Sequence, residues 1–521
     1  MISLNVLIFL PLLSIILVAL SPERLAKVIT LIVSLAAFFL SVFLYTKIDV
    51  GNPDFQLISR YFWLGYYDST IQQWVSYVDV KYIVGIDGVS GLLIMLTTLL
   101  FPLSVLFSWQ RNYHNSKLYF SLLLFLETAL LGVFCALDVL LFYIFFEATL
   151  IPVFFLIGIW GGKDRYKASV KYLVYNLFGS LLMLVAILYL GYVGGDMVNG
   201  GVFTTDYMKL RNARIGLSVQ QWLFIGFALS FAIKSPLFPF HTWIADTYAN
   251  TTVGAMLVAL LIKIGIYGFI RYTLPLLPDA CVYYAPVMSV LATCGVIYGA
   301  IIAMKQPDMK RLLAYSSVSH IGFIVLGIFS INEEALSGSV LQLINYSIST
   351  GALFLCVGML ALRNDERSVL VFDYQGVAKV MPVYTFFFVL SALSSIGLPG
   401  LNSFVGEFLI LLGSYSSTVV NVKPYIIVST MGVIFAAVYM LYMLKKVLFG
   451  NLESERVKNL EDITLRERLV LAPLAILMIA IGLYTSIFLR SIQPVADNIV
   501  QKVKESQKEM VESYSLQVTS Y

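Results

Sequence analysis

The chain has 521 residues, of which 59% are hydrophobic and only 12% are charged. An ordinary soluble domain is about 45–50% apolar and about 25% charged, so this composition excludes a water-soluble protein. The formal net charge is only +4, and the basic residues are spread over short loops, which excludes a nucleic-acid-binding protein. The four cysteines lie singly in apolar runs without CxxC or CxxH pairing, so neither a disulfide framework nor an iron–sulfur or zinc site is expected.

The elements predicted along the chain are membrane-spanning helices. A helix of about 20 apolar residues crosses the bilayer, and about fourteen windows of the sequence qualify. In chain order they cover residues 3–20, 27–45, 83–107, 118–136, 139–159, 170–193, 220–243, 253–273, 282–303, 311–330, 337–361, 382–415, 425–444 and 469–489. The sequence therefore predicts an all-α polytopic membrane protein with about 14 transmembrane helices. The first window lacks a basic leader and a small-residue cleavage site, so we expect a retained span.

The connecting segments are mostly short and leave no room for a separate soluble domain. Only residues 46–82, 194–219, 362–381, 445–468 and the tail from 491 exceed about a dozen residues. The tail carries a run of charges, and we expect it to be a short surface helix or disordered. If both termini lie outside, the inner loops hold 20 of the 34 basic residues, including Arg24, Lys27 and Lys117. The positive-inside rule therefore predicts that both termini lie on the outer side.

Among the ionisable residues inside predicted spans, five stand out: Glu147, Lys234, Lys263, His320 and Glu407. A charged residue at a helix centre costs about 2.5–3.5 kcal/mol, so such a residue normally faces the bundle interior and has a partner or a task. Any one of them could be a structural ion pair or a satisfied polar group. Five together favour a charge-transfer path, because a carboxylate that moves relative to a buried lysine makes a switchable proton site.

Helix breakers stand next to two of these charges. Pro236 and Pro239 follow Lys234, while Gly397, Pro399 and Gly400 precede Glu407. Proline in a helix interior removes a backbone donor, so we expect each span to be interrupted, either as a simple kink or at an ion-handling site.

The two halves of the chain show a common spacing. Glu147 and His320 are 173 residues apart, as are Lys234 and Glu407. This suggests two inverted five-helix repeats, 118–273 and 282–444, each with one discontinuous helix. Helices 1–3 would precede them within 1–110, and residues 445–521 would supply a loop, helix 14 and the tail.

Four motifs are familiar: FFEATLIPVFFLIGIWGG (145–162), KSPLFPFHTW (234–243), DMKRLLAYSSVSHIGF (308–323) and LPGLNSFVGEF (398–408). With these motifs the chain resembles the antiporter-like subunits of respiratory complex I over about residues 80–450. It is most similar to the chain M branch of bacterial NADH–quinone oxidoreductases, which corresponds to mitochondrial subunit 4. The resemblance implies a fourteen-helix bundle with two inverted repeats and a discontinuous helix in each.

The resemblance also implies site residues. Glu147 would pair with Lys234, and the relay would continue through Lys263 and His320 to Glu407, where a glutamate in place of lysine favours chain M. His241 is a further relay candidate, although it could equally just hold the broken helix. Tyr248 and Tyr346 stand where the family commonly has histidines. Because tyrosine hardly titrates near neutral pH, bound water would have to carry those steps.

The expected function is that of a proton-translocating membrane-arm subunit of NADH–quinone oxidoreductase without a redox centre of its own. The sequence has no GxGxxG, Walker motif or cysteine cluster, and His114 in a loop makes no haem pair. NADH, FMN, iron–sulfur clusters and quinone are expected on partner subunits, which would include two sibling antiporter-like chains. The expected location is a bacterial inner membrane, or the mitochondrial inner membrane if the chain is organelle-encoded. The alternatives are a multisubunit sodium/proton antiporter or membrane-bound hydrogenase, and a scaffold that has lost transport.

Overall fold

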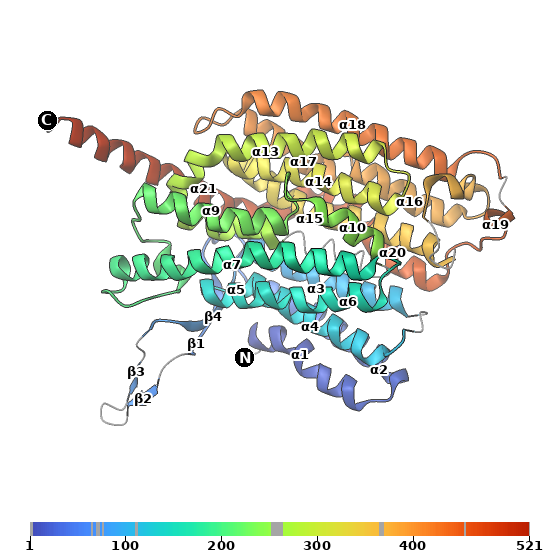
Figure 1. Ribbon diagram of the computed structural model, residues 1–521, viewed down its shortest axis with the longest axis horizontal. Helices are drawn as coiled ribbons and strands as arrows, with labels where there is room; N and C mark the ends of the chain where they lie inside the picture. The colour runs from blue at the N-terminus through green and yellow to red at the C-terminus, as the bar shows by residue number, and fades with distance from the viewer. Residues whose placement is uncertain are drawn as a thin grey trace.

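A computed structural model describes residues 4–63, 66–68, 73–75, 78–109, 113–251, 264–363, 369–452 and 455–519. Most helices run side by side along the long axis of the molecule (Figure 1). In the first half the helices are α1 (Leu4–Leu20), α2 (Glu23–Tyr45), α3 (Gly88–Ser108), α4 (Ser116–Cys135), α5 (Val139–Ala148), α6 (Leu150–Trp160), α7 (Arg165–Val198), α8 (Tyr207–Leu210), α9 (Leu217–Lys234) and α10 (Thr242–Asn250). In the second half they are a π-helical turn, η1 (Phe269–Thr273), then α12 (Leu274–Leu276), α13 (Pro278–Met304), α14 (Met309–Phe329), α15 (Glu333–Arg363), the 3₁₀ turns η2 (Val371–Tyr374) and η3 (Val377–Lys379), α16 (Pro382–Ser395), α17 (Asn402–Tyr415), α18 (Lys423–Leu448), α19 (Glu455–Lys458), α20 (Leu465–Leu483) and α21 (Thr485–Thr519).

The described helices confirm a multi-pass membrane protein. Within the described ranges, ten helices are long and apolar enough to cross a membrane, or up to twelve if each of two bent pairs counts as one span. Helix α1, with 17 residues, is shorter. The predicted span 253–273 lies mostly outside the described residues. The number of fourteen spans therefore remains a prediction.

Two membrane helices are interrupted where the sequence predicts it. The first break separates Lys234, the last residue of α9, from Thr242, the first of α10. It contains two prolines, which cannot donate a backbone hydrogen bond. The second break lies between Ser395 and Asn402. Here Gly397 and Gly400 have φ of +75° and +93°, a left-handed region that residues with a Cβ rarely adopt.

The prediction of an all-α fold was incomplete, because described residues between 56 and 86, including the start of the predicted span 83–107, form strands. Strand β1 (Gln56–Phe62) pairs antiparallel with β4 (Lys81–Ile86), and the short strands β2 (Tyr66–Asp68) and β3 (Gln73–Val75) pair with each other. Windows of 20 apolar residues do not detect strands this short. Their sequence signal is the run of aromatic and β-branched residues in RYF and KYIV.

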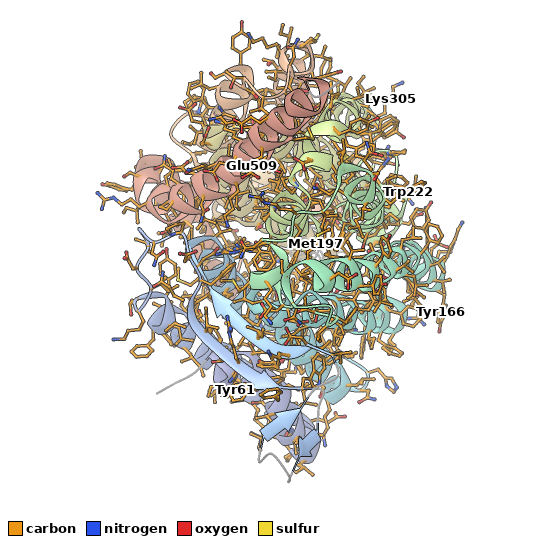
Figure 2. The ribbon with its side chains drawn as sticks, turned by 90° about the vertical axis from the view of Figure 1, so that its left-hand side faces the viewer. Tyr61, Tyr166, Met197, Trp222, Lys305 and Glu509 are labelled. Carbon is orange, nitrogen blue, oxygen red and sulfur yellow. The ribbon has the colours of Figure 1, made fainter. Side chains whose placement is uncertain are left out.

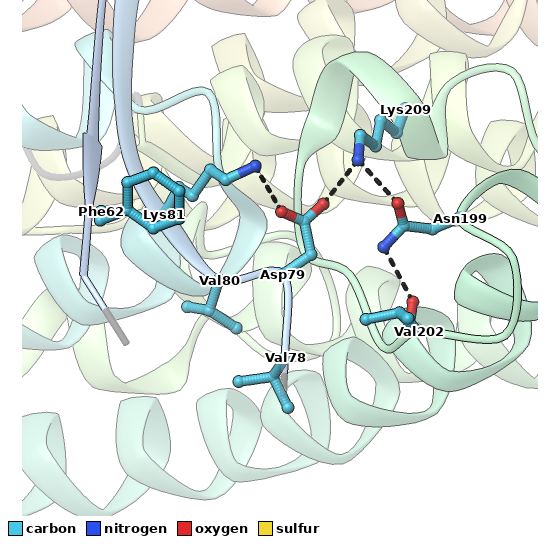
Figure 3. A pocket seen from close by; sticks show the side chains of 8 residues that line it. All are labelled: Phe62, Val78, Asp79, Val80, Lys81, Asn199, Val202 and Lys209. Carbon is cyan, nitrogen blue, oxygen red and sulfur yellow. Dashed lines mark hydrogen bonds and ion pairs between the residues drawn. The ribbon is translucent and has the colours of Figure 1, made fainter. Parts of the chain in front are cut away.

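A polar cluster fixes the base of this hairpin. The Asp79 carboxylate accepts a hydrogen bond from Lys209 at 2.8 Å and one from Thr204 at 2.9 Å, and Lys81 lies 2.6 Å from its other oxygen. The three charged residues line a cavity of about 250 Å³ (Figure 3). Burial raises the pKa of Asp79, but the hydrogen bonds from Lys209 and Lys81 outweigh it and hold that pKa below its usual value. The cluster ties the hairpin to the connection between α7 and α9.

Both ends of the described chain lie at this end of the bundle, here called the hairpin end. Asn5, near the start of α1, is hydrogen-bonded to Tyr61 and Tyr82 of the hairpin. At the other terminus, α21 turns by 74° from α20 and crosses the hairpin end, which faces the viewer in Figure 2.

The tail is helical, which was one of the two expectations, but the helix is long and not short. Helix α21 continues for 35 residues to Thr519. It is held because apolar side chains recur at helical spacing and are buried against the bundle; they are Ile492, Val495, Ala496, Ile499, Val500 and Val503. Polar contacts add to this packing, since Lys504 pairs with Glu333 at 2.6 Å and Ser506 donates to Asp279.

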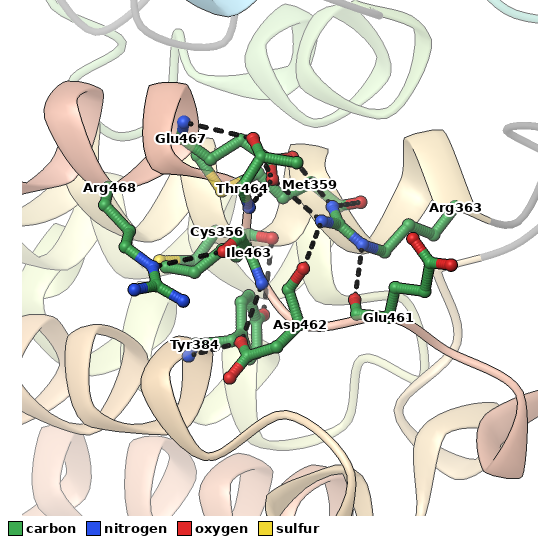
Figure 4. A network of polar contacts seen from close by, with 10 residues as sticks. All are labelled: Cys356, Met359, Arg363, Tyr384, Glu461, Asp462, Ile463, Thr464, Glu467 and Arg468. Atoms are coloured by element: carbon green, nitrogen blue, oxygen red, sulfur yellow. Dashed lines mark hydrogen bonds and ion pairs between the residues drawn. The ribbon is translucent and has the colours of Figure 1, made fainter.

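The opposite end of the bundle, here called the basic end, carries the loops rich in lysine and arginine. It is formed by the start of α2, α4, α7 and α14 and the end of α6, α10 and α15. Figure 4 shows one of its polar networks. Arg363, the last residue of α15, binds both carboxylate oxygens of Glu467 at 2.8 Å. Asp462 accepts hydrogen bonds from the first backbone N–H groups of α16, so the network joins α15, α16 and α20.

Candidate functional site

Lys234 is buried at the first helix break. Its side chain is 1% exposed, and its Nζ donates to Thr149 Oγ1 at 3.0 Å. The same ammonium lies 4.9 Å from the centre of the Phe146 ring. Thr149 stands at the junction of α5 and α6, so Lys234 contacts residues on both sides of Glu147.

Glu147 lies next to this lysine without being locked to it. The two charges interact electrostatically, and Ser180 of α7 hydrogen-bonds the carboxylate. No direct ion pair joins Glu147 to Lys234, and Glu147 Oε1 has no hydrogen-bond partner among the described residues. One oxygen of the carboxylate is therefore not held by any described group beside the buried ammonium.

His241 lies in the same break, immediately before α10. It is 3% exposed, and its ring packs against Phe238, Tyr298 and Tyr315. Its Nδ1 atom has no hydrogen-bond partner in the described part of the chain. Lys263 lies outside the described residues.

A second polar cluster forms beside the second break. Glu407 of α17 is 6% exposed, so it points into the bundle and away from lipid. Gln342 Nε2 donates to its Oε1 at 3.1 Å, and His320 Nδ1 lies 3.3 Å from the same oxygen. The other ring nitrogen of His320 is 3.5 Å from Ser395 Oγ, at the end of α16.

Sequence reasoning missed the amides and hydroxyls that hold this break. Asn345 donates to the backbone oxygen of Asn402 at 2.8 Å. Asn402 in turn bonds Ser394 and Ser349, on the two helices that flank it. With Gln342, the residues Asn345 and Ser349 form a polar stripe at i, i+3 and i+7 on the buried helix α15. This spacing places the three side chains on one face of the helix, and it could have been recognised in the sequence.

Tyr248 and Tyr346, the two tyrosines that depart from the family pattern, come together. Tyr346 of α15 donates to Ser317 Oγ of α14 at 2.5 Å. Tyr248 of α10 is fully buried beside the Tyr346 hydroxyl. The rings of Tyr346 and His320 are 6.0 Å apart. Buried hydroxyls thus extend from α10, which follows the first break, to the His320–Glu407 cluster.

A buried ion pair at the hairpin end was also missed. Arg271 Nη2 lies 2.5 Å from Asp87 Oδ2, with side-chain exposures of 4% and 0%. Asp87 is the residue directly before α3. Arg271 lies in the π-helical turn η1, directly before α12. Both charges fall inside predicted spans, 83–107 and 253–273, and their distance in sequence hid the pairing.

Among the described residues, no group of three or more His, Cys, Asp and Glu could hold a metal ion. The arrangement offers titratable side chains and hydroxyls, which are the groups that hold and pass protons.

Comparison with known proteins gives the family of the chain. The family described as NADH:quinone oxidoreductase/Mrp antiporter matches residues 136–435. NADH-quinone oxidoreductase subunit M of Rhodobacter capsulatus is 36% identical over 487 residues, which cover 92% of this chain and 91% of that protein. NADH-ubiquinone oxidoreductase chain 4 of Chondrus crispus is 35% identical, over 93% of this chain and 94% of that protein.

A solved structure shows the same fold. A chain of respiratory complex I from Thermus thermophilus superposes with a TM-score of 0.84 at 28% identity, covering 96% of this chain and all of that one. The family match spans more than half of the sequence, and the first relatives are covered almost completely. The chain therefore belongs to the family of membrane subunits shared by NADH:quinone oxidoreductases and Mrp antiporters.

Proposed function

We propose that the chain is a proton-translocating membrane-arm subunit of an NADH–quinone oxidoreductase. One observation carries the proposal: a carboxylate and a base lie together beside each of the two helix breaks. The pairs are Glu147 with Lys234 and Glu407 with His320. Relatives named as subunits of that enzyme support the choice of reaction.

Energy reaches the relay from outside the chain. NADH, FMN, iron–sulfur clusters and quinone belong to partner subunits, and two sibling antiporter-like chains lie in the same membrane arm. Quinone reduction changes the charge of a neighbouring subunit and displaces the Glu147 carboxylate. The ammonium of Lys234 then loses its counter-charge and releases its proton. Moving one charge against 100 mV requires about 2.3 kcal/mol, which the loss of one buried charge contact can supply.

The released proton passes from the first half of the chain to the second. His241 extends the first cluster, and the hydroxyls of Tyr248 and Tyr346 lead toward His320. Lys263, which lies outside the described residues, is a further member of the proposed relay. Glu407 receives the proton and delivers it to the hairpin end. The two clusters belong to inverted repeats, 118–273 and 282–444, of a bundle of about 14 spans, preceded by 1–110 and followed by 445–521. The hairpin end with both termini faces the outside of a bacterial inner membrane, by the positive-inside rule.

A sodium/proton antiporter subunit is the second candidate, since the matching family includes Mrp antiporters. The same side chains would then exchange protons for sodium without electron transfer. Replacing sodium by potassium in the assay separates the two functions. Proton uptake that requires NADH and is indifferent to sodium supports the oxidoreductase; uptake that requires sodium supports the antiporter.

Glu407→Gln tests the second cluster. The amide keeps the size of the side chain and one acceptor for Gln342, but it cannot take up a proton. We expect assembled complexes with proton uptake into inverted membrane vesicles lowered by about tenfold or more, because a relay group typically contributes two orders of magnitude or more. Glu467→Gln, in the Arg363 network at the basic end, is the matched control and should leave uptake per assembled complex unchanged. Normal uptake in Glu407→Gln vesicles would remove Glu407 from the path.

Tyr346→Phe tests the hydroxyl connection. Phenylalanine preserves the ring but removes the donor to Ser317, so we expect proton uptake to fall by about tenfold while complex assembly is retained. Tyr346→His should restore uptake and make it depend on pH near the ordinary pKa of histidine, about 6.5. A Tyr346→Phe complex that pumps normally would show that protons bypass this hydroxyl.

A further inference from the structure

A cavity of about 210 Å³ opens at the basic end between the first turns of α2 and α4. Its lining consists of Glu23, Arg24, Lys27, Tyr113 and Ser116. The surrounding segments are tied together, since Lys27 Nζ donates to the backbone oxygen of Trp109 at 2.9 Å. Lys117, beside Ser116, donates to the backbone oxygen of Ala19 at 3.1 Å. The proton relay uses none of these residues.

The charges around this Arg24–Lys27 cavity suit a monovalent anion. Arg24 and Lys27 against Glu23 leave a net charge of +1. Arg24 is exposed and has no hydrogen-bond or ion-pair partner among the described residues, so its guanidinium is available. Glu23 disfavours a more highly charged anion such as a phosphate monoester. A phosphodiester carries one negative charge and matches the cavity.

The backbone adds donors at the same place. Neither α2 nor α4 has a side-chain cap at its N-terminus: Pro22 precedes α2 and Asn115 precedes α4. The first N–H groups of α4 begin at Ser116, which is 6% exposed and lines the cavity. Uncapped N–H groups at a helix start bind oxyanions, and here they lie beside two cationic side chains.

Apolar surface next to the cavity distinguishes a lipid from a free anion. Leu17 and Leu20 at the end of α1 are 57% and 80% exposed, and Leu25 on α2 is 49% exposed. These leucines offer contact to acyl chains that begin at the cavity. A soluble phosphate would gain nothing from them.

Aromatic residues pack behind the cavity. Tyr113 stacks on Tyr119 with ring centres 3.9 Å apart, and the Trp160 ring is 5.2 Å from Tyr119. Trp160 Nε1 also donates to the backbone oxygen of His114. The three rings are buried, so they form the protein wall behind the cavity.

We infer that the Arg24–Lys27 cavity binds the phosphodiester head group of an anionic phospholipid, with the acyl chains along the exposed leucines of α1 and α2. The basic end faces the cytoplasmic leaflet in the orientation proposed above, and that leaflet presents anionic lipids to basic pockets between helices. The bound lipid fills the space between the α1–α2 pair and α4. This site is independent of the proton relay.

Photolabelling of the intact complex in lipid nanodiscs tests the inference. The discs contain phosphatidylcholine with a trace of phosphatidylglycerol that carries a photoreactive group on an acyl chain. We expect labelled peptides from residues 13–32. Arg24→Gln with Lys27→Gln should lower that labelling by at least about fivefold, since each basic residue near the surface contributes on that scale. The charge-preserving pair Arg24→Lys and Lys27→Arg should keep it within about twofold of wild type.

One control variant and two further conditions identify what binds in the cavity. Lys305→Gln with Lys445→Gln removes the same charge from exposed basic-end positions away from the cavity and should leave labelling of 13–32 unchanged. Equal labelling in the Arg24/Lys27 variant and the wild type would overturn the inference. Loss of labelling on addition of inorganic phosphate, but not of chloride at equal ionic strength, would assign the cavity to a free anion. Labelling only after the complex is dissociated would assign it to an acidic partner chain.

The proton uptake of the Arg24/Lys27 variant should stay at the wild-type level, so failure of this inference leaves the proposed relay untouched.

Discussion

The Glu147→Gln complex is expected to assemble normally and to lose about nine-tenths or more of its NADH-driven proton uptake. Glutamine has the shape of glutamate and still offers an acceptor to Ser180, so the packing of α5 against α7 is preserved. Glutamine lacks the negative charge that interacts with the Lys234 ammonium. With no counter-charge to remove, a signal from a partner subunit can no longer alter how firmly Lys234 holds its proton.

The measurement is proton uptake into inverted membrane vesicles, normalised to the amount of assembled complex. Glu127→Gln provides a control, because Glu127 is a fully buried glutamate on the adjacent helix α4. Its Oε2 accepts a hydrogen bond from Ser34 at 2.9 Å, and no cation contacts it within the described residues. The control should pump normally. Wild-type uptake in assembled Glu147→Gln complexes would instead support a scaffold without transport.

The sequence was sufficient to identify a multi-pass membrane protein and the positions of the two breaks. Transfer free energy accumulates over 20 consecutive residues, so composition alone identifies a span. Proline and glycine act locally on the backbone, so Pro236, Pro239, Gly397 and Gly400 mark the breaks without any knowledge of packing. The same local argument singles out Lys234 and Glu407, because a charge in an apolar run is costly wherever the run packs.

Contacts between distant segments could not be predicted in this way. The hairpin depends on pairing between residues 56–62 and 81–86, and α21 is ordered by a surface that many other helices build. Nothing in the sequence distinguishes Gln342 and Asn345 from other polar residues. They belong to the site because α17 brings Glu407 and Asn402 within hydrogen-bonding distance of them. The spacing of 173 residues also does not show on which side of a break each charge lies. Lys234 lies before the first break, whereas Glu407 lies after the second.

The Asp87–Arg271 pair is the clearest example of such a hidden contact, and it leads to the largest expected effect on stability. Arg271→Met should destabilise the folded chain by about 3–5 kcal/mol, because it leaves the Asp87 carboxylate buried without a cation. Asp87 remains tied to the start of α3, where it accepts hydrogen bonds from Ser90, so it cannot turn to water. The loss also removes the donor to Tyr267 and the contact with the Phe55 ring of the segment before β1.

A double-mutant cycle separates the charge from the packing. Asp87→Asn keeps an oxygen that can cap α3 but carries no charge, so combining it with Arg271→Met should recover part of the lost stability. Arg214→Met is the control, since Arg214 is 85% exposed in its pair with Glu509 and should change stability by less than about 1 kcal/mol. The readout is the temperature at which the detergent-solubilised complex loses this chain. If Arg271→Met were as stable as Arg214→Met, water would have to reach Asp87, and the hairpin end would be more open than the burial of this pair requires.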